Sequence, residues 1–465
     1  MSGLFGVVSN ANCMDELFYG TDYQSHLGTE FGGLAIGGEA LSRAIHRISN
    51  GQFKNLFYGF YHRHEGTCGV GVISDSNPQP IIVKSVLGTF TVVTAGLIEN
   101  AREVEEDLLA GGVTFSEVVD GQLNQTELVA QVISHSPDIL TGIRRVFDRV
   151  QGSLSLLLMN EDGIYAASDR NGRLPLTVGR KGDCHCVTSE TCAFPNLGLR
   201  TVRTLEGGEI VLISDDGVCQ LEAPAGTKEI CTFLWIYTGY PASSYEGISV
   251  EAVRERCGRA LARKDVVAAD LAAGVPDSGT GHAVGYAVES GLPFRRPLVK
   301  YAAGYGRSYI PPSQEVRDRI AKMKLIPIED IIRGKRLIIC EDSIVRGTQL
   351  KNLTIQKLWE AGAAEVHVRV ACPPLMFPCR YNLSTQTSGE LVARRAIMDI
   401  EGKSPDPDTI AKYLDPASDA YAAMIEWIRA DLGCTSLDFL TMDEVIQAVQ
   451  LDRADLCTCC WRGYS

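Results

Sequence analysis

The sequence predicts an α/β protein built from two unlike halves, and three observations support this expectation. From residue 1 to about 228, short apolar segments recur between turns rich in Gly, Asn and Asp, a pattern typical of strands in layered sheets. From about 229 to 420, apolar strands alternate with helical patterns, and this βαβ rhythm indicates a parallel sheet. Residues 421–465 add helices and a cysteine-rich tail.

The first half is expected to form two sheets that pack face to face, with helices on the outside. Each expected strand is a run of apolar residues bounded by turn residues. The strands are expected at residues 4–8, 67–73, 81–86, 89–93, 154–159, 164–167, 176–178 and 210–213. Helical periodicity appears at residues 100–109 and 125–134.

The second half is expected to form a parallel sheet, which binds ligands at the carboxyl ends of its strands. Its strands are expected at residues 272–276, 297–301, 337–340 and 366–372. Its helices are expected at residues 250–263, 283–290 and 350–361. Two further helices are expected at residues 418–430 and 442–449.

The composition limits the class of protein. The 465 residues carry a formal net charge of −13, which argues against a general nucleic-acid binder. No apolar run approaches the roughly 20 residues needed to cross a bilayer. The first residues contain neither the basic nor the apolar region of a signal peptide. We therefore expect a cytoplasmic protein with no membrane or nucleic-acid partner.

The most informative stretch follows the apolar strand at residues 337–340. Two adjacent acids, Glu341 and Asp342, end this strand, and a short polar loop leads into a helix. The loop residues expected to bind ligand are Ser343, Arg346, Gly347 and Thr348. The backbone N–H groups of such a loop and the positive end of the following helix bind phosphate. The paired acids can bind ribose hydroxyls, directly or through a divalent cation such as Mg²⁺.

A second loop of small residues follows the strand expected at residues 272–276. Small side chains let the backbone approach a second anion closely. The residues of this loop expected to bind ligand are Asp277, Ser278, Gly279 and Thr280. Residues 304–309 form a glycine-rich, cationic segment of the kind that closes over a site. Positive charge for a phosphate-rich ligand is expected from Lys300, Arg307 and Lys324.

Two phosphate loops and an acid pair on one parallel sheet favour 5-phosphoribosyl 1-pyrophosphate (PRPP) as the ligand. Its 5′-phosphate is expected at residues 343–349, its pyrophosphate with Mg²⁺ at residues 277–281, and its ribose diol at Glu341 and Asp342. An amine that displaces the pyrophosphate passes through a cationic sugar, and metal and lid charges stabilise the leaving group. A kinase is a weaker interpretation, because neither G-x-x-x-x-G-K-[ST] nor G-x-G-x-x-G occurs in the sequence.

The chain contains 15 cysteines, an odd number that does not indicate a disulfide framework in a long chain. Three of them, Cys457, Cys459 and Cys460, lie close to the C-terminus. A CxxC pair needs two further thiolates to complete a metal or iron–sulfur site. Spacing alone leaves two interpretations open, such a site or a set of reduced, buried thiols.

These motifs together resemble those of the glutamine PRPP amidotransferases, which make 5-phosphoribosylamine at the start of purine synthesis. The resemblance is strongest at residues 275–281, 306–325, 341–348 and 374–381 and at the terminal cysteines. It implies an N-terminal nucleophile (Ntn) hydrolase-like αββα sandwich at residues 1–228 and a type I phosphoribosyltransferase domain at residues 229–420. It also implies a homo-oligomer.

The resemblance gives the cysteines a specific role. In the iron–sulfur branch of that family, four cysteines hold a [4Fe–4S] cluster between the domains. The matching positions here are Cys231, Cys379, Cys457 and Cys460. Cys459 is then a neighbour of the cluster and not a ligand.

The glutaminase half departs from the family pattern. Ser2 stands at the position of the nucleophilic cysteine, and Leu27 stands where a His-Arg-Gly-Gln segment has its arginine. Ser74 replaces the arginine that holds the glutamine carboxylate, Ala95 replaces an oxyanion-hole asparagine, and Gln125 replaces the aspartate that binds the glutamine amine. Losing one oxyanion donor typically costs on the order of a hundredfold in rate. These changes predict that glutamine hydrolysis is lost.

Three functions stay open from the sequence. The first is a phosphoribosyltransferase that condenses PRPP with ammonia or another amine. The second is a glutamine-dependent amidotransferase in which Ser2 serves as the nucleophile. The third is a non-catalytic regulatory protein that binds PRPP.

Overall fold

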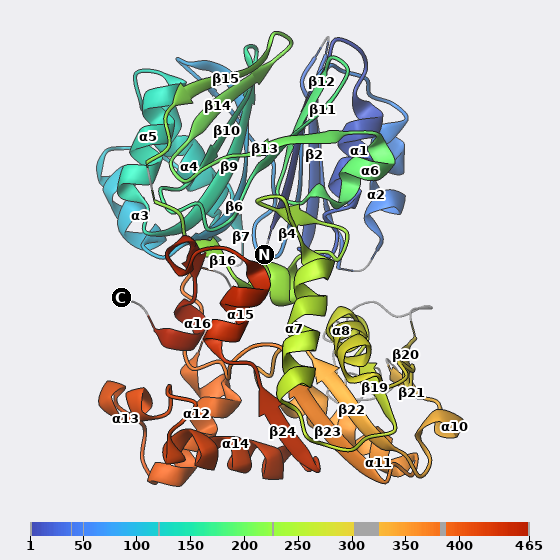
Figure 1. Ribbon diagram of the computed structural model, residues 1–465. Helices are drawn as coiled ribbons and strands as arrows, with labels where there is room; N and C mark the ends of the chain where they lie inside the picture. Colours follow the sequence, from blue (N-terminus) through green and yellow to red (C-terminus); the bar gives the residue numbers. More distant parts are fainter. Residues whose placement is uncertain are drawn as a thin grey trace.

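The computed structural model describes residues 2–38, 40–49, 51–119, 121–225, 227–301, 325–381 and 387–463. The chain forms two lobes, and the N-terminal lobe lies above the C-terminal lobe in Figure 1. The N-terminus lies at the level of the junction between them (Figure 1). We call residues 2–225 the N-terminal lobe and residues 227–463 the C-terminal lobe.

The N-terminal lobe contains two antiparallel sheets that pack face to face (Figure 1). The seven-stranded sheet contains, in spatial order, β13 (Arg200–Thr204), β11 (Thr177–Lys181), β12 (Cys184–Thr188), β1 (Gly3–Val8), β4 (Cys68–Ser74), β2 (Phe31–Gly37) and β3 (Ser42–Arg47). The six-stranded sheet contains β15 (Gly217–Glu222), β14 (Ile210–Ser214), β10 (Gly163–Ser168), β9 (Gly152–Asn160), β6 (Gly88–Ile98) and β5 (Ile81–Ser85). A separate two-stranded ribbon contains β7 (Val118–Val119) and β8 (Gln122–Leu123).

Strand β1 illustrates why these layers form. Its Leu4 and Val8 pack into the core between the two sheets, whereas Phe5 and Val7 pack into the core beneath the outer helices. Successive side chains of a strand point to opposite faces, so a continuously apolar strand is buried on both. The outer helices are α1 (Met14–Asp22), α2 (Phe53–Tyr61) and α6 (Phe194–Leu197) on one side, and α3 (Ala101–Ala110), α4 (Gln125–Ser134) and α5 (Ile139–Arg149) on the other. The predicted pair of sheets with outer helices is confirmed.

The C-terminal lobe is built on a parallel sheet, as predicted, but the strand expected at residues 297–301 is not part of it, because β20 (Leu298–Lys300) pairs antiparallel with β21 (Leu325–Pro327). Its four strands are β19 (Leu271–Gly274), β22 (Arg336–Glu341), β23 (Glu365–Val370) and β24 (Ser436–Phe439), all paired in parallel. Its helices are α7 (Val250–Lys264), α8 (Thr280–Ser290), α10 (Glu329–Ile332), the π-helix η3 (Leu350–Ile355), α11 (Gln356–Glu360), α12 (Val392–Glu401), α13 (Pro407–Lys412), α14 (Asp419–Leu432) and α15 (Met442–Val449). Strand β24 lies beyond residue 420, so the sheet takes its last strand from the C-terminal stretch.

Short elements connect the two lobes. They are β16 (Ile230–Cys231), the π-helix η2 (Leu234–Thr238), β17 (Ser244–Tyr245), β18 (Ile248–Ser249), β25 (Leu456–Cys457) and α16 (Cys459–Arg462). The remaining short elements are η1 (Thr191–Ala193), β20 (Leu298–Lys300), β21 (Leu325–Pro327), η4 (Ser388–Glu390) and η5 (Arg453–Asp455). Strand β16 pairs in parallel with β25, which joins the start of the C-terminal lobe to its tail.

Several strands of the N-terminal lobe are not predicted by apolar patterning. Strand β2 contains three glycines, and β3 and β13 are mostly polar. These strands form because a partner strand is available in the sheet, and intrinsic strand preference is weaker than this context. Strand β2 pairs along its whole length with β4, whose residues are buried.

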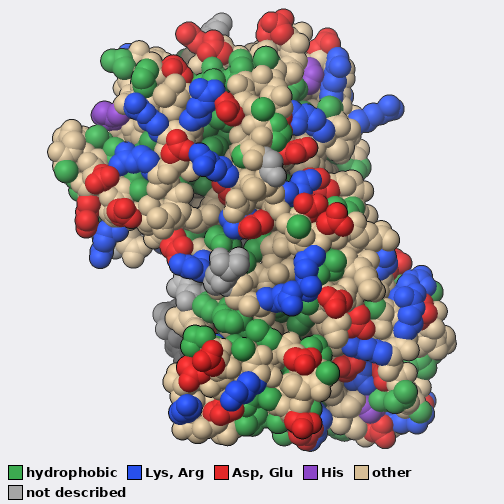
Figure 2. Space-filling view, turned by 60° about the vertical axis from the view of Figure 1, so that its left-hand side comes forward, with side chains coloured by type: hydrophobic (Ala, Val, Ile, Leu, Met, Phe, Trp, Pro, Cys, Tyr) green, Lys and Arg blue, Asp and Glu red, His purple; other side chains and the backbone are tan. Residues whose placement is uncertain are grey.

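The surface carries charges of both signs. Figure 2 shows Lys and Arg side chains mixed with Asp and Glu side chains over the visible face. Within the described residues, no helix is both long enough and apolar enough to span a membrane.

Candidate active site

The two predicted phosphate loops lie side by side at the carboxyl end of the parallel sheet. The amide of Val275 donates to the carbonyl oxygen of Cys340 at 3.0 Å, which joins the loop after β19 to the end of β22. A Cβ atom on Gly279 would lie 2.3 Å from the same carbonyl oxygen, and one on Gly274 would lie 2.3 Å from the Gly279 carbonyl oxygen. Both positions therefore need glycine for close backbone contact. The loops form one hydrogen-bonded unit.

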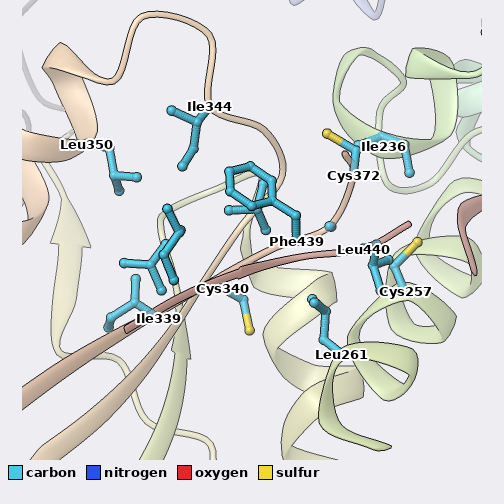
Figure 3. Packing of buried hydrophobic residues seen from close by; sticks show 14 of the residues in the cluster. Ile236, Cys257, Leu261, Ile339, Cys340, Ile344, Leu350, Cys372, Phe439 and Leu440 are labelled. Atoms are coloured by element: carbon cyan, nitrogen blue, oxygen red, sulfur yellow. The ribbon is translucent and has the colours of Figure 1, made fainter. Parts of the chain in front are cut away.

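The loop after β22 is anchored at both ends by buried side chains. Ile344 and Leu350 point into the core of the C-terminal lobe, near Ile339 and Cys340 of β22 (Figure 3). Between these anchors, Gly347 takes a φ of 76°, a left-handed conformation that favours glycine. The amide of Lys351 donates to the Gly347 carbonyl oxygen at 2.9 Å and begins the following helix. The predicted strand, loop and helix are all present.

The acid pair lies at the start of this loop and is nearly inaccessible to water. Glu341 is 9% exposed and Asp342 is 4% exposed. The hydroxyl of Ser343 donates to Asp342 Oδ2 at 2.7 Å. Burial raises the pKa of Glu341, and the neighbouring Asp342 charge raises it further. Two buried carboxyl groups side by side are the kind of oxygen ligands that a divalent cation takes.

The cations predicted for the site have other partners. Lys300 Nζ lies 2.9 Å from Asp277 Oδ2 on the first phosphate loop. Arg346 pairs with Glu390 at 3.0 Å. The predicted Arg307 and Lys324, and the predicted lid at residues 304–309, lie outside the described residues.

Sequence reasoning missed a buried arginine on α7. Arg254 of α7 is 2% exposed and lies within electrostatic range of Asp342. Its guanidinium donates to the carbonyl oxygens of Trp235, Tyr237 and Gly239 at 3.0, 2.9 and 2.8 Å. Burial lowers the pKa of Arg254. From sequence alone, an Arg on an amphipathic helix is expected to face solvent, so the pattern did not predict that Arg254 is buried.

Thiol groups from three distant segments meet at the junction of the lobes. In the pairing of β16 with β25, Cys231 lies opposite Cys457. The amides of residues 376–377 donate to the carbonyl oxygen of Cys460 at 3.0 Å each, which brings the segment before Cys379 onto the tail. A hydrogen bond with the Cys379 thiol raises the pKa of Cys460, and burial raises that of Cys231. The structure thus brings the four predicted ligand cysteines together.

Among the residues that the structure describes, no three or more His, Cys, Asp or Glu side chains are grouped so that they could hold a metal ion. Cys459 lies beside Cys457, and their hydrogen bond lowers the pKa of Cys457 to about 7.

Ser2 lies at the start of β1, beside a very small cavity. Its hydroxyl donates to Ser74 Oγ at 3.4 Å. The cavity has a volume of about 20 Å³, which is room for one water molecule. Its lining residues are Ser2, Leu27, Leu174, Pro175, Ser189, Glu190, Leu234 and Tyr245.

The residues at the other glutaminase positions serve the fold. The side chain of Gln125 accepts from the Ile98 amide at 3.0 Å and donates to the Ile98 carbonyl oxygen at 3.3 Å, so it extends the pairing of β6. Asn124 caps helix α4 by accepting from the Thr126 amide at 2.9 Å. Ala95 is 2% exposed and has no side-chain donor to offer an oxyanion.

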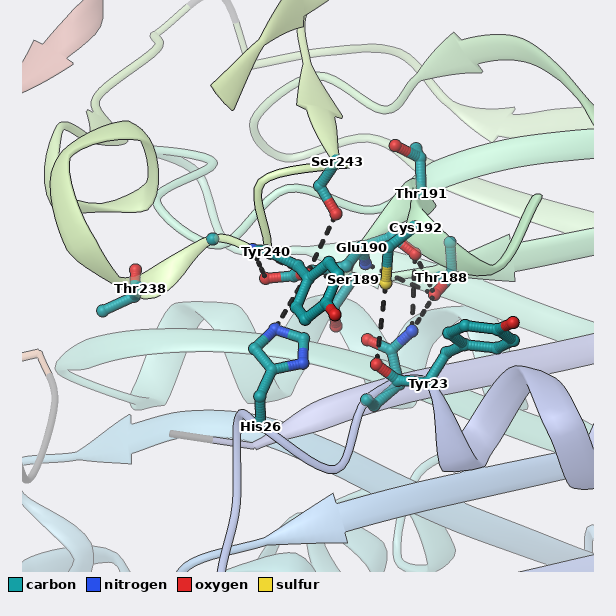
Figure 4. A network of polar contacts seen from close by, with 12 residues as sticks. Tyr23, His26, Thr188, Ser189, Glu190, Thr191, Cys192, Thr238, Tyr240 and Ser243 are labelled. Atoms are coloured by element: carbon teal, nitrogen blue, oxygen red, sulfur yellow. Dashed lines mark hydrogen bonds and ion pairs between the residues drawn. The ribbon is translucent and has the colours of Figure 1, made fainter. Parts of the chain in front are cut away.

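A buried carboxylate that sequence reasoning also missed joins this region to the C-terminal lobe. Glu190 is 1% exposed and accepts from Tyr245 OH at 2.8 Å and from Ser243 Oγ at 2.9 Å. The backbone amide of Tyr240 and the ring of His26 also reach it, the ring at 2.9 Å (Figure 4). Glu190 follows β12 of the seven-stranded sheet, and through these contacts it holds the segment before α7 against that sheet.

Comparison with known proteins gives matches over the whole chain. Residues 68–196 match the family described as glutamine amidotransferase domain. The amidophosphoribosyltransferase of Methanocaldococcus jannaschii is 30% identical over 490 aligned residues, covering 100% of this chain and 97% of that protein. The solved glutamine PRPP amidotransferase of Bacillus subtilis, complexed with ADP and GMP, has a TM-score of 0.85 and 29% identity, covering 99% of this chain and 96% of that one. A structure titled as the allosteric regulatory enzyme of purine biosynthesis also has a TM-score of 0.85, at 29% identity and 99% coverage of this chain.

Proposed function

The chain belongs to the amidophosphoribosyltransferase family, and we propose that it condenses PRPP with ammonia or another amine. Membership of the family makes it a phosphoribosyltransferase-type enzyme linked to purine biosynthesis. In the proposed reaction the amine nitrogen forms a bond to C1 of the ribose while the bond from C1 to the pyrophosphate oxygen breaks. A phosphoribosylamine and pyrophosphate leave the site.

The observation that carries this proposal is the buried acid pair between two joined phosphate loops. In this proposal the ribose hydroxyls of PRPP bind Glu341 and Asp342, and the 5′-phosphate binds backbone N–H groups of residues 343–349. The pyrophosphate binds at residues 277–280, where Lys300 lies beside Asp277. Because these groups are held by the sheet, they are positioned before the substrate arrives.

Mg²⁺ fits the donor set of this site. Glu341 and Asp342 would hold it through carboxylate oxygens, and both side chains are buried. When bound, Mg²⁺ supplies positive charge to the departing pyrophosphate. The chain's own contribution is to keep the two acids adjacent and to orient Asp342 through the Ser343 hydroxyl.

We further propose that glutamine hydrolysis is absent. A nucleophile needs an oxyanion hole and a pocket that orients the amide. The cavity beside Ser2 is about 20 Å³, and Gln125 is committed to the backbone of Ile98. Ammonia would then enter from solution.

We propose a [4Fe–4S] cluster at the junction, held by Cys231, Cys379, Cys457 and Cys460. Their convergence from three segments supports it, as does the burial of Cys457, which is 8% exposed. A cluster there would cross-link the start and the end of the C-terminal lobe, and so stabilise the docking of the N-terminal lobe.

One assay tests the activity. The full chain, purified without oxygen, is given PRPP and Mg²⁺ with ammonium at alkaline pH, with glutamine, or with neither, and pyrophosphate release is measured. We expect release with ammonium only. Equal release with glutamine would show that Ser2 serves as a nucleophile and would refute the proposed loss.

The same preparations distinguish the regulatory alternative. If no pyrophosphate appears under any condition, but PRPP raises the Tm of the protein, the chain binds PRPP without turning it over. The matched variant Asp342→Asn is expected to lose both the release and the PRPP-dependent rise in Tm, because the acid pair is broken.

A further inference from the structure

Arg173 of the N-terminal lobe lies at the thiol site of the junction. It follows β10 in the chain and is 7% exposed. Its carbonyl oxygen accepts from the amide of Cys231 at 3.1 Å. Its guanidinium carbon lies 3.8 Å from the ring centroid of Tyr381, two residues after Cys379. One residue thus contacts two of the cysteine-bearing segments.

The guanidinium of Arg173 also acts on the third segment. The guanidinium lies within electrostatic range of Cys457 and Cys459 in the tail. It forms an ion pair with Glu229, yet its buried Nε has no hydrogen-bond partner among the described residues. An unpaired buried donor costs about 1–3 kcal/mol, and more when it is charged. Such a group is suited to a site that holds an anion.

We propose that Arg173 is a positioning residue that compensates the negative charge of the cluster and holds the N-terminal lobe against it. The inference rests on the proposed [4Fe–4S] cluster. Four thiolates around such a cluster give a doubly negative site, which gains one more negative charge on one-electron reduction. A fixed cation beside it stabilises the reduced state more than the oxidised state, and so raises the reduction potential.

Glu229 does not cancel this effect. Its side chain is 41% exposed, whereas that of Arg173 is 9% exposed. Water screens the carboxylate more strongly than the buried guanidinium. Arg173 is therefore expected to raise the reduction potential of the cluster by more than Glu229 lowers it.

The test compares variants of the full chain, purified without oxygen. Iron and sulfide content are measured first. The reduction potential is then obtained by a redox titration in which the electron paramagnetic resonance signal of the reduced cluster is monitored. Arg173→Gln is expected to weaken the reduced state about tenfold, a shift of about 59 mV to lower potential. Glu229→Gln is expected to shift the potential upward, and Arg173→Lys to lie close to the wild type.

Arg170→Gln is the matched control, since Arg170 is 64% exposed and pairs with Asp148. It is expected to leave the potential unchanged. Unaltered potentials in Arg173→Gln and Glu229→Gln, with full iron content, would overturn the role of Arg173 while the cluster stands. Absence of iron from the wild type would overturn both. If Arg173→Gln loses its iron, Arg173→Lys decides: iron content and a potential close to those of the wild type support the inference, because the charge is kept, and loss of iron from this variant as well overturns it.

Discussion

At the candidate active site, the burial of acidic side chains costs the folded protein stability. Glu341 is buried next to Asp342, and burial raises its pKa. Lys300 and Arg346, two cations predicted for the site, pair with Asp277 and Glu390. The folded protein carries the cost of burying the acid pair.

Because burying the Glu341 charge costs stability, replacing Glu341 with a neutral side chain is expected to raise stability while it lowers activity. Glu341→Gln is expected to reduce pyrophosphate release by about a hundredfold or more, since a proposed metal ligand is lost. Without ligands, it is expected to raise the Tm at pH 7 by roughly 2–4 °C, the effect of ~1 kcal/mol in a domain of this size. Calorimetry of both proteins measures this shift.

The sign follows from the raised pKa. Below the unfolded-state pKa, Glu341 is protonated in both states and burial carries no charge cost. As the pH rises through the unfolded-state pKa toward the raised folded-state pKa, the wild type loses stability, because only the unfolded chain releases the proton freely. The Tm difference between variant and wild type should therefore grow with pH, whereas a constant difference would contradict it. Asp399→Asn, at an exposed position, is the control.

At the scale of elements, the active site depends on how closely two strand-to-loop units approach. Strands β19 and β22 are neighbours, and the loops that follow them share the carbonyl oxygen of Cys340. The sequence predicted each unit separately, because each has an apolar strand, small residues and a helix. The contact between the two units requires pairing between segments about 65 residues apart in the chain. The local sequence pattern does not specify which distant strands pair.

Gly279→Ala tests this contact. A Cβ at this position would lie 2.3 Å from the Cys340 carbonyl oxygen and 2.7 Å from the Val275 amide nitrogen, so backbone must move. We expect at least a tenfold rise in the Kd for PRPP, measured by calorimetric titration in the presence of Mg²⁺. Gly59→Ala in α2 is the control, because the nearest atom is the flexible Arg63 Nη2 at 3.5 Å. That variant should bind PRPP normally and gain about 0.5–1 kcal/mol of stability.

At the scale of the whole molecule, the two lobes are joined by buried polar and thiol groups. Glu190 binds the segment before α7 to the N-terminal lobe. The four junction cysteines all belong to the C-terminal lobe, and the amide of one of them, Cys231, donates to the carbonyl oxygen of Arg173 in the N-terminal lobe. Glu190 and Arg173 therefore tie the lobes at two places.

The cysteine connection predicts that the proposed cluster contributes to stability. Cys457→Ser is expected to lower iron content to a small fraction of that of the wild type and to lower the Tm by several degrees, since metal binding energy is also folding energy. Iron analysis and calorimetry under anaerobic conditions measure both. Cys219→Ser, at an exposed position in β15, should change neither. Full iron content in Cys457→Ser would exclude this residue as a ligand.

Local pattern was enough to predict the α/β class, the parallel sheet of the C-terminal lobe and the two units of strand, loop and helix, because these depend on apolar runs and on small residues at strand ends. It did not predict glycine-rich β2 or polar β3, which form only where partner strands are available. Only the tertiary structure brought the four cysteines together and buried Glu190, Arg254 and Arg173. From sequence alone, a charged side chain is expected to face solvent. Packing between distant segments decides which charged side chains are buried and so join the lobes.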